Sequence, residues 1–202
     1  SGTNGGELCR FVTREASTSA NPYRATVVNG YINISDNKVR GMDLNLRYTG
    51  DVGPGSLRIN AGATRYFEQA SRIAKTDPLD DDNGEIYTPK WTGDLDVTYK
   101  IGKVSLYYGL NWVGAMDSYA AVGEDPATSI YQFRTPDYFT HDASVSVNIK
   151  DFRITAGVRN FTDREPPQIS AFVYNRLGNS PLYSGFDFVG RTFFVNFSAK
   201  VF

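Results

Sequence analysis

The sequence alternates apolar and polar residues with a period of two in seven separate segments, and this pattern constrains the fold more than any other feature. In the first segment, residues 42–48, the even-numbered positions are apolar and the odd-numbered positions are polar. The same alternation recurs over residues 57–64, 91–100, 104–112, 138–149, 152–159 and 193–201. Because successive side chains of a strand point to opposite faces, the pattern predicts seven antiparallel strands that share one apolar face. A less regular eighth strand is expected within residues 23–35.

The connections between these segments alternate in length. Residues 50–55, 101–103 and 150–151 are short, whereas residues 69–88, 114–137 and 163–188 are long. In an antiparallel sheet this order places every short turn at one end and every long loop at the other. Outer-membrane barrels have this arrangement, with short periplasmic turns and long extracellular loops, and a soluble sandwich has no need of it.

The two faces of the predicted strands also differ in chemistry. The polar face carries Asn, Ser, Thr, Asp, Arg and Gly but few Lys or Glu, which suits a crowded, wet interior. Aromatic residues lie near both ends of the apolar face, as in the two interfacial girdles of a barrel. They are Phe67, Trp91, Trp112 and Phe139 at the long-loop ends and Tyr48, Tyr99 and Phe152 at the short-turn ends.

The length of the apolar face matches a membrane. The run from Phe139 to Ile149 covers about 23 Å at ~3.3 Å per residue and a tilt of about 45°. The apolar band of an outer-membrane barrel is roughly 25 Å tall. We therefore predict an all-β, antiparallel transmembrane β-barrel.

Composition excludes several other classes of protein. The chain has 21 Lys and Arg against 22 Asp and Glu, a net charge of −1, so no basic surface for nucleic acid is expected. A hydrophobic fraction of 41% with a charged fraction of 21% excludes a disordered chain. The sequence contains no run of 18 apolar residues, so no transmembrane helix is predicted.

No feature of the sequence predicts catalysis. His141 is the only histidine, and it falls on the apolar face near a strand end, where a residue of the membrane rim is expected. The sequence has no CxxC, HExxH or glycine-rich phosphate loop, and no Ser/His/Asp or Cys/His group can be proposed with any geometry. We therefore expect no enzyme activity and no organic cofactor.

Residues 77–85 form the densest charge cluster. An EF-hand aligned on this segment would need acidic residues at two positions that hold Leu79 and Lys90, so that motif is excluded. Two interpretations stay open, a Ca²⁺ site of another type and a solvated extracellular loop. The candidate metal ligands are Asp80, Asp81 and Asp82.

Several motifs resemble those of TonB-dependent outer-membrane receptors. Residues 157–167, which run from Gly157 through Asn160 and Asp163 to Pro167, look like a strand-to-loop segment of that family. Residues 190–202 resemble the family's last strand. Asn33 with residues 39–44 is similar to a strand start of the pattern Asn…Gly-x-Glu/Asp, and residues 8–14 look like a receptor loop. The resemblance covers about residues 30–202.

The resemblance implies a 22-stranded barrel filled by an N-terminal plug, with this chain supplying the last seven or eight strands. Residues 1–36 would form an extracellular loop and the start of a strand, and residues 37–202 the C-terminal barrel segment. No plug domain and no TonB box is found in the sequence, so we expect the chain to be one part of a longer receptor.

Cys9 is the only cysteine. It is expected either to be a free thiol or to form a disulfide with a partner outside this chain. The resemblance supports the disulfide, since family members often pair a cysteine at this place with one a few residues upstream.

The resemblance also implies a function, the active uptake of a scarce nutrient across the bacterial outer membrane. The expected partners are the N-terminal part of the same receptor, outer-membrane lipid, TonB acting through the plug, and a nutrient ligand. The sequence leaves the cargo open among ferric siderophores, carbohydrates and cobalamin-like ligands.

The long loops hold the candidate ligand-binding residues. Aromatic, guanidinium and amide side chains bind sugars, siderophores or peptides by stacking and hydrogen bonding, although loops of this composition also pack against one another. The candidates are Tyr119, Tyr131, Arg134, Gln168, Tyr174, Arg176 and Tyr183. On the polar face, Arg58, Arg153 and Arg159 could contact an anionic ligand, but contact with the plug or with wall carboxylates is the favoured expectation. Such carboxylates include Asp43, Asp94 and Asp96.

Three alternatives remain at this stage. A self-contained eight-stranded outer-membrane barrel would act as a porin or a structural surface protein, although eight strands close around side chains and leave no channel. A soluble β-sandwich would serve as an adhesin or binding module, and it would be soluble without detergent. An outer-membrane enzyme would need the catalytic group that the sequence lacks.

Overall fold

A computed structural model describes residues 11–14, 18, 25–28, 35–75, 77–118, 128–170 and 175–199. The chain forms two compact units, one of residues 1–37 and 71–80 and the other of residues 38–70 and 81–202. All regular elements of the described residues are β-strands. None of the described residues belongs to a helix that is long and apolar enough to span a membrane.

The smaller unit contains a two-stranded antiparallel sheet. It is formed by β1 (Val12–Arg14) and β2 (Ala25–Val27), with Thr13 opposite Thr26. A strand is present within residues 23–35, as expected, but it belongs to this small sheet and not to the long one. Its described part, β2, is short and pairs with β1 instead.

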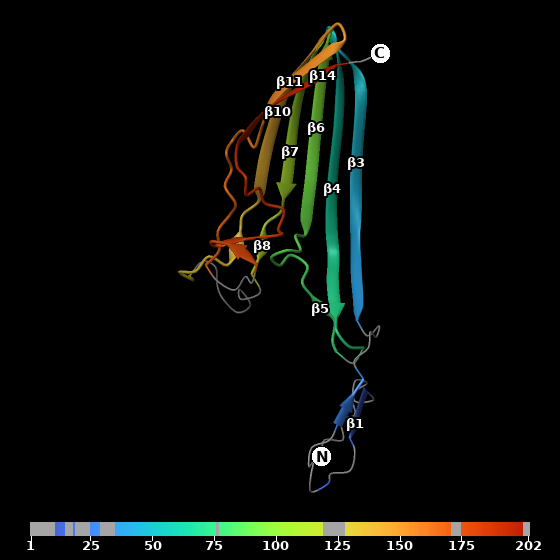
Figure 1. Cartoon of the computed structure of the whole chain (residues 1–202), viewed down its shortest axis with the longest axis vertical. Helices are drawn as coiled ribbons and strands as arrows, with labels where there is room; N and C mark the ends of the chain where they lie inside the picture. Colours follow the sequence, from blue (N-terminus) through green and yellow to red (C-terminus); the bar gives the residue numbers. More distant parts are fainter. Residues whose placement is uncertain are drawn as a thin grey trace. The chain divides into compact units, whose positions relative to one another are not determined.

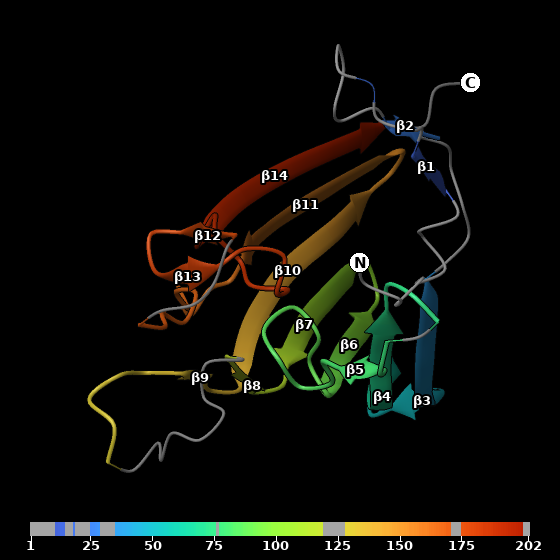
Figure 2. The ribbon, with the colours of Figure 1, turned by 90° about the horizontal axis from the view of Figure 1, so that it is seen from below.

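The larger unit is built on a long antiparallel sheet with the strand order β14-β11-β10-β7-β6-β4-β3. Figures 1 and 2 show these strands side by side along an arc. All seven strands predicted from the alternation are confirmed, and β5 (Asp80–Asp81) pairs with β4 beside them. Their bounds are β3 (Asp36–Val52), β4 (Gly55–Arg72), β6 (Trp91–Ile101), β7 (Val104–Val113), β10 (Tyr138–Ile149), β11 (Phe152–Arg159) and β14 (Thr192–Ala199).

Two-residue turns join the strands at one end. They lie between β3 and β4, between β6 and β7, and between β10 and β11. Gly53, Gly102 and Lys150 occupy them with φ values of 57°, 56° and 51°. Turns with left-handed residues match the twist of a hairpin, so these turns help to fix the register of each pair.

The long connections carry two short hairpins of their own. One pairs β8 (Met116–Asp117) with β9 (Arg134–Thr135), and the other pairs β12 (Arg176–Leu177) with β13 (Ser180–Pro181). The described parts of the long connections lie at the end of the sheet opposite the two-residue turns, as the alternation of lengths predicted.

The register gathers the apolar positions of the sheet onto one face. Across six strands, the paired residues at one level are Ile59, Val97, Tyr108, Ala143, Val158 and Phe193. No described strand of the larger unit covers this face: Leu44 is 64% exposed and Val195 is 74% exposed. A soluble sandwich would bury such a face beneath a second sheet, and none is present among the described strands.

Aromatic residues lie at both ends of the apolar face, as predicted. Trp91 and Trp112 stack with ring centroids 6.0 Å apart near the long loops, and Phe152 stacks on Phe197 at 5.3 Å near the short turns. His141 lies on this face opposite Leu110, and its Nδ1 is 2.8 Å from the hydroxyl of Tyr108. The prediction of a rim position for His141 agrees with this placement.

Side-chain hydrogen bonds between adjacent strands stabilise the polar face. The Tyr107 hydroxyl donates to Asp96 at 2.5 Å, and the Thr64 hydroxyl donates to Asp43 at 2.6 Å. Across β10 and β11, the hydroxyls of Ser146 and Thr155 are 2.8 Å apart. Each bond joins side chains that the register places close together.

One part of the expectation for this face, contact of the arginines with the wall carboxylates, is wrong. Among the described residues, Arg58, Arg153 and Arg159 make no ion pair with the wall carboxylates. Arg153 donates to the hydroxyl of Ser146 at 3.4 Å, and the guanidinium of Arg159 lies 5.5 Å from the ring centre of Phe194. Two of the wall carboxylates accept hydrogen bonds from other side chains, Asp43 from Thr64 and Asp96 from Tyr107.

The long sheet is open among the described residues. β3 and β14 are its edge strands, and each pairs with a neighbour on one side only. The part of the chain that the structure describes therefore forms a barrel wall that is not closed on itself.

We expect Gly157→Ala to destabilise the sheet. A Cβ at Gly157 would lie 2.6 Å from the Phe194 ring, 2.6 Å from Ser144 Cβ and 2.7 Å from the carbonyl oxygen of Ala143. Overpacking of this kind costs roughly 1–3 kcal/mol. The midpoint of heat-induced unfolding in detergent, read from gel mobility, should fall. Ala156→Val on the exposed opposite face is the matched control, and an equal loss in both variants would contradict the prediction.

Candidate functional site

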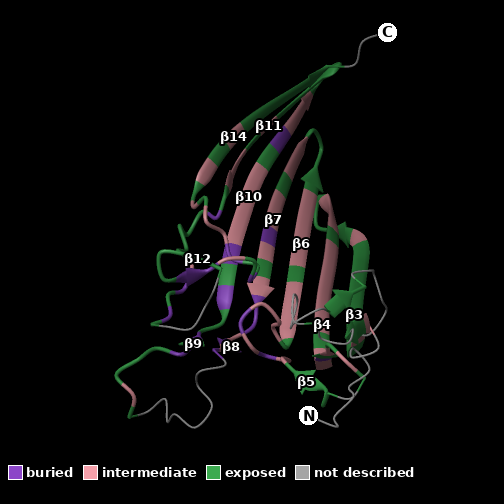
Figure 3. Cartoon of the chain, turned by 60° about the horizontal axis from the view of Figure 1, so that its bottom comes forward, coloured by how far each residue is buried: buried purple, intermediate pink, exposed green. Residues whose placement is uncertain are grey.

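The largest buried apolar cluster of the described residues lies where the long loops meet the end of the sheet. We call the described parts of residues 82–90, 114–137 and 162–190 the loop cap. Figure 3 shows buried residues concentrated at this end of the sheet. The cluster consists of Ile86, Val113, Met116, Tyr138, Ile169 and Phe186, with Tyr87 and Phe188 packed against it.

Hydrogen bonds join each long loop to the next. The backbone N–H of Ile86 in the first loop donates to the Asp117 carbonyl in the second at 3.0 Å, and within the second loop the N–H of Ser118 donates to the Phe133 carbonyl at 2.7 Å. Gln132 and Ser170 then exchange two bonds, from Gln132 N–H to the Ser170 hydroxyl at 2.7 Å and from Ser170 N–H to the Gln132 carbonyl at 2.8 Å. The loops therefore form one packed layer, which is the self-packing that the sequence analysis left open.

Tyr138 connects this layer to the sheet. It is the first residue of β10, it is 2% exposed, and its ring meets Phe186 edge-on at 4.9 Å. Its hydroxyl donates to the carbonyl of Arg164 at 3.1 Å and accepts from the N–H of Asp187 at 3.2 Å. One side chain thus fixes two points of the last long loop.

Asn160 is a second anchor for the same loop. It is 1% exposed and has a φ of 45°. Its side-chain N–H donates to Asp187 at 2.9 Å and to the Arg164 carbonyl at 3.1 Å, and its oxygen accepts from Arg164 N–H at 2.8 Å. Asn tolerates the left-handed region better than most residues, so this position combines a turn with a full set of hydrogen bonds.

Asp163 closes the loop onto the start of β14. It accepts from the N–H of Arg191 at 2.9 Å and pairs with the Arg191 guanidinium at 3.0 Å. These two donors, the backbone N–H first, hold the pKa of the Asp163 carboxyl below its ordinary value. We call this pair the Asp163–Arg191 clasp.

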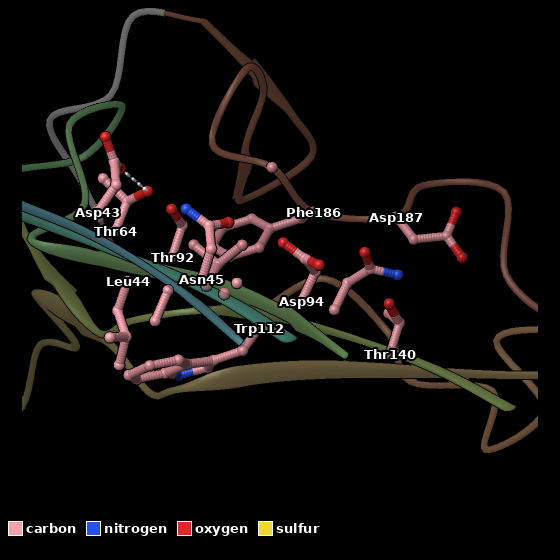
Figure 4. A pocket seen from close by; sticks show the side chains of 16 residues that line it. Asp43, Leu44, Asn45, Thr64, Thr92, Asp94, Trp112, Thr140, Phe186 and Asp187 are labelled. Carbon is pink, nitrogen blue, oxygen red and sulfur yellow. Dashed lines mark hydrogen bonds between the residues drawn. The ribbon is translucent and has the colours of Figure 1, made fainter. Parts of the chain in front are cut away.

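A hollow of about 690 Å³ lies on the polar face of the sheet where it meets the loop cap. Figure 4 shows that Phe186 and Asp187 reach it from the last long loop, whereas Leu44 and Trp112 lie on the other side of the strands. Side chains of five strands supply the rest of its polar lining. They are Asp43, Asn45, Thr64, Thr92, Asp94, Asn111 and Thr140.

The hollow is acidic. Its lining includes three carboxylates and no Lys or Arg. Asp187 accepts hydrogen bonds from Asn160 and Val189, and Asp43 accepts one from Thr64, whereas Asp94 makes no hydrogen bond with any described residue. The carboxylate of Asp94 occupies the space over Gly62, where a Cβ would lie 2.6 Å from it. The site therefore offers free acceptors to hydroxyl and N–H groups and repels anions.

A smaller hollow of about 310 Å³ continues from the first. The two share Asn111, Thr140 and Asp187, and the smaller one adds Asp142 and Arg159. Arg159 brings a positive charge to this polar surface. The combined lining is rich in amide, hydroxyl and carboxylate groups that can orient a polar ligand.

The candidate ligand residues lie on the loop cap and away from the hollow. Tyr131 is 57% exposed and Tyr183 is 79% exposed. Arg134 forms an ion pair with Asp117 at 3.2 Å, and Gln168 and Arg176 are exposed. None of these five lines the hollow. Tyr119, Tyr174 and Cys9 lie outside the described residues.

Sequence reasoning missed most of the lining of the hollow. The alternation assigned Asp43, Asn45 and Asn111 to the polar face, but it gave no level along the strands. Register supplies that level, since it aligns Asp94 with both Gly62 and Asn111. The signal that would have located the site is a glycine paired with a carboxylate on the neighbouring strand, as Gly62 is with Asp94.

The described residues contain no group of three His, Cys, Asp or Glu side chains placed to hold an ion. One oxygen of Asp81 accepts hydrogen bonds from the N–H groups of Gln69 and Asn83 at 3.0 and 3.2 Å. Asp80 is exposed and Asp82 is half-buried. Ca²⁺ binding by these three residues stays a prediction.

Comparison with known proteins identifies one family. A sequence model described as TonB dependent receptor-like, beta-barrel, matches residues 10–161. No curated protein matches the chain. The matched range takes in six of the seven long strands, β3 to β11. Residues 162–202, which include part of the clearest resemblance seen in the sequence, lie outside it.

We expect Tyr138→Phe to loosen the loop cap. The change removes both hydrogen bonds of the hydroxyl and leaves the N–H of Asp187 without that acceptor, at a cost of about 1–2 kcal/mol. Trypsin cleavage after the exposed Arg176, followed by mass spectrometry of the fragments, should become faster. Tyr131→Phe is the control, because its hydroxyl has no partner among the described residues. Equal cleavage rates in the two variants would contradict this role of Tyr138.

The Asp163–Arg191 clasp predicts a defined response to acid. Because the folded pKa of Asp163 lies below its ordinary value of 3.8, the clasp contributes its full stability above that pH and loses it as the pH falls through the lowered pKa. The difference in unfolding midpoint between the natural protein and Asp163→Asn should be constant from pH 8 to about pH 4 and then close. Asp151→Asn, an exposed carboxylate at a turn, should show no such difference at any pH.

Proposed function

Since the chain belongs to the TonB-dependent receptor-like β-barrel family, whose members are outer-membrane transporters and not enzymes, we propose that it forms part of the wall of a receptor that imports a scarce nutrient. The observation that carries the proposal is the segregation of the long sheet into two faces. No described strand covers the apolar face, and the polar face bears a hollow beneath the loop cap. A wall between lipid and an aqueous interior has this construction.

The open edges support a larger barrel. In lipid, the unpaired backbone groups of β3 and β14 would each cost several kcal/mol. We infer that both edges pair with strands of the N-terminal part of the same receptor, in a 22-stranded barrel whose plug faces the polar side and is pulled by TonB. A self-contained eight-stranded barrel would need an additional strand to link β3 with β14, and no described strand does so.

The loop cap and the hollow together support a ligand cup. Tyr131, Arg134, Gln168, Arg176 and Tyr183 are displayed on the outer side of a packed layer, so their exposure costs no core contact. Below them, Asp43, Asp94 and Asp187 present acceptors. A hydroxyl-rich cargo such as a carbohydrate fits these acceptors better than an anionic ferric siderophore would.

Uptake by whole cells tests the proposal. Cells with and without the gene would be given ¹⁴C-maltotriose, anionic ⁵⁵Fe-enterobactin or ⁵⁷Co-cobalamin, in the presence and absence of a protonophore. We expect receptor-dependent accumulation, with maltotriose favoured, and its loss when the protonophore removes the energy source. Receptor-dependent uptake that continues unchanged with the protonophore would point to a passive pore and contradict the proposal.

Asp94→Asn refines the same assay. The variant removes a charge that has no described partner, so we expect normal folding and a several-fold higher KM for the transported probe with little change in maximal rate. Asp151→Asn removes a charge at a two-residue turn and should leave the uptake kinetics unchanged. An unchanged KM in Asp94→Asn would show that the hollow does not contact the cargo.

A further inference from the structure

Arg65 is the one basic residue on the apolar face of the ladders that join β4, β6, β7, β10, β11 and β14. It pairs with Trp91 at the last position of the β4–β6 ladder. The other residues on this face of these ladders are aliphatic, aromatic or small, apart from His141. A guanidinium at this place needs a physical reason, because a charge on the lipid-facing side of a barrel is destabilising.

Aromatic rings hold the guanidinium of Arg65. Its central carbon lies 5.2 Å from the ring centre of Phe67 and 5.1 Å from that of Trp91. Trp91 stacks on Trp112 at 6.0 Å, and Trp112 stacks on Phe139 at 6.1 Å with an interplanar angle of 7°. These rings form a row across β4, β6, β7 and β10, which we call the aromatic row.

The donors of Arg65 have no acceptor among the described residues. Cation–π contact uses the flat face of a guanidinium and leaves its in-plane N–H groups available. Basic residues nearby are neutralised instead, since Lys38 and Arg40 both contact Glu68, at 2.8 and 2.7 Å. Arg65 is therefore an oriented cation with unused donors on an apolar face.

The level of Arg65 on the sheet indicates what meets it. Aromatic girdles mark the boundary between the hydrocarbon and the headgroups. The indole N–H of Trp112 donates to the carboxylate of Asp137 at 3.1 Å, so polar groups begin at this level of the sheet. A lipid that lies along the apolar face would place its headgroup beside Arg65.

We propose that Arg65 and the aromatic row bind the anionic headgroup of an outer-leaflet lipid through its phosphate. The inference rests on the proposed function, because it requires the apolar face to contact the outer membrane. The guanidinium fork matches a phosphate, and the apolar positions below Arg65 on β4 contact the acyl chains. A free phosphate ion would gain the first interaction only.

Native mass spectrometry of the natural protein in detergent tests this site. The protein is titrated with dimyristoylphosphatidylglycerol or with dimyristoylphosphatidylcholine, which have the same acyl chains and differ in headgroup charge. We expect tighter binding of the anionic lipid, and we expect Arg65→Gln to weaken that binding on the order of tenfold while leaving the zwitterionic lipid unaffected.

Three further variants separate charge from packing. Arg65→Lys keeps the charge but loses the planar fork, so its affinity should fall between those of the natural protein and Arg65→Gln. Trp91→Leu removes the ring support and should weaken binding several-fold. Lys103→Gln makes the same change of charge at a two-residue turn and should bind both lipids normally.

Several results would overturn the site. These are equal binding of the two lipids by the natural protein, an anionic preference that persists in Arg65→Gln, and an equal loss in Lys103→Gln. Displacement of the lipid by inorganic phosphate at an equal concentration would show an anion site without lipid specificity. Gel mobility of unheated samples confirms folding of each variant, and the loss of binding by the natural protein in high salt gives a reading that needs no variant.

The lipid assay and the uptake assay fail independently. Lipid retention is measured on purified protein without cargo or energy source, so its failure leaves protonophore-sensitive uptake intact. Conversely, absent uptake with normal retention of the anionic lipid would contradict import and keep the headgroup site.

Discussion

Backbone hydrogen bonding in a continuous antiparallel ladder is the constraint on which the rest of this structure depends. Where no water is available, every N–H and C=O group must pair with a neighbouring strand. Once the strands pair, the register decides which side chains share a face and a level. Ile59, Val97 and Tyr108 then lie in line on one side of the sheet, and Gly62, Asp94 and Asn111 lie in line on the other.

The distribution of buried residues follows from the same constraint. A single sheet that faces lipid on one side and water on the other has no second layer packed against it, so it needs no apolar core. The buried apolar cluster lies instead where the long loops meet the end of the sheet, around Tyr138, Met116 and Phe186. This cluster makes the loop cap a preformed layer, and a preformed layer would present the proposed ligand-binding residues at a lower entropic cost than separate loops would.

The segment from Asn160 to Asp163 illustrates how a family motif gains a physical meaning. Asn160 turns the chain at the end of β11 and fixes the last long loop through Arg164 and Asp187. Asp163 then holds the start of β14 through Arg191. The motif is a junction between wall and loop, and no part of it lies among the exposed ligand candidates.

The sequence by itself determined the strands, their faces and the side on which the long loops gather, because a period of two is a local property of each segment. The extension of β3 and β4 beyond the predicted segments could not be seen, since polar residues at the ends of these strands furthest from their shared two-residue turn break the alternation. Only the tertiary structure decided which carboxylate faces which glycine, which loop residues are buried and which arginine has no acceptor. Those features depend on pairing between strands that are distant in the chain, and a one-residue change of register would reverse them.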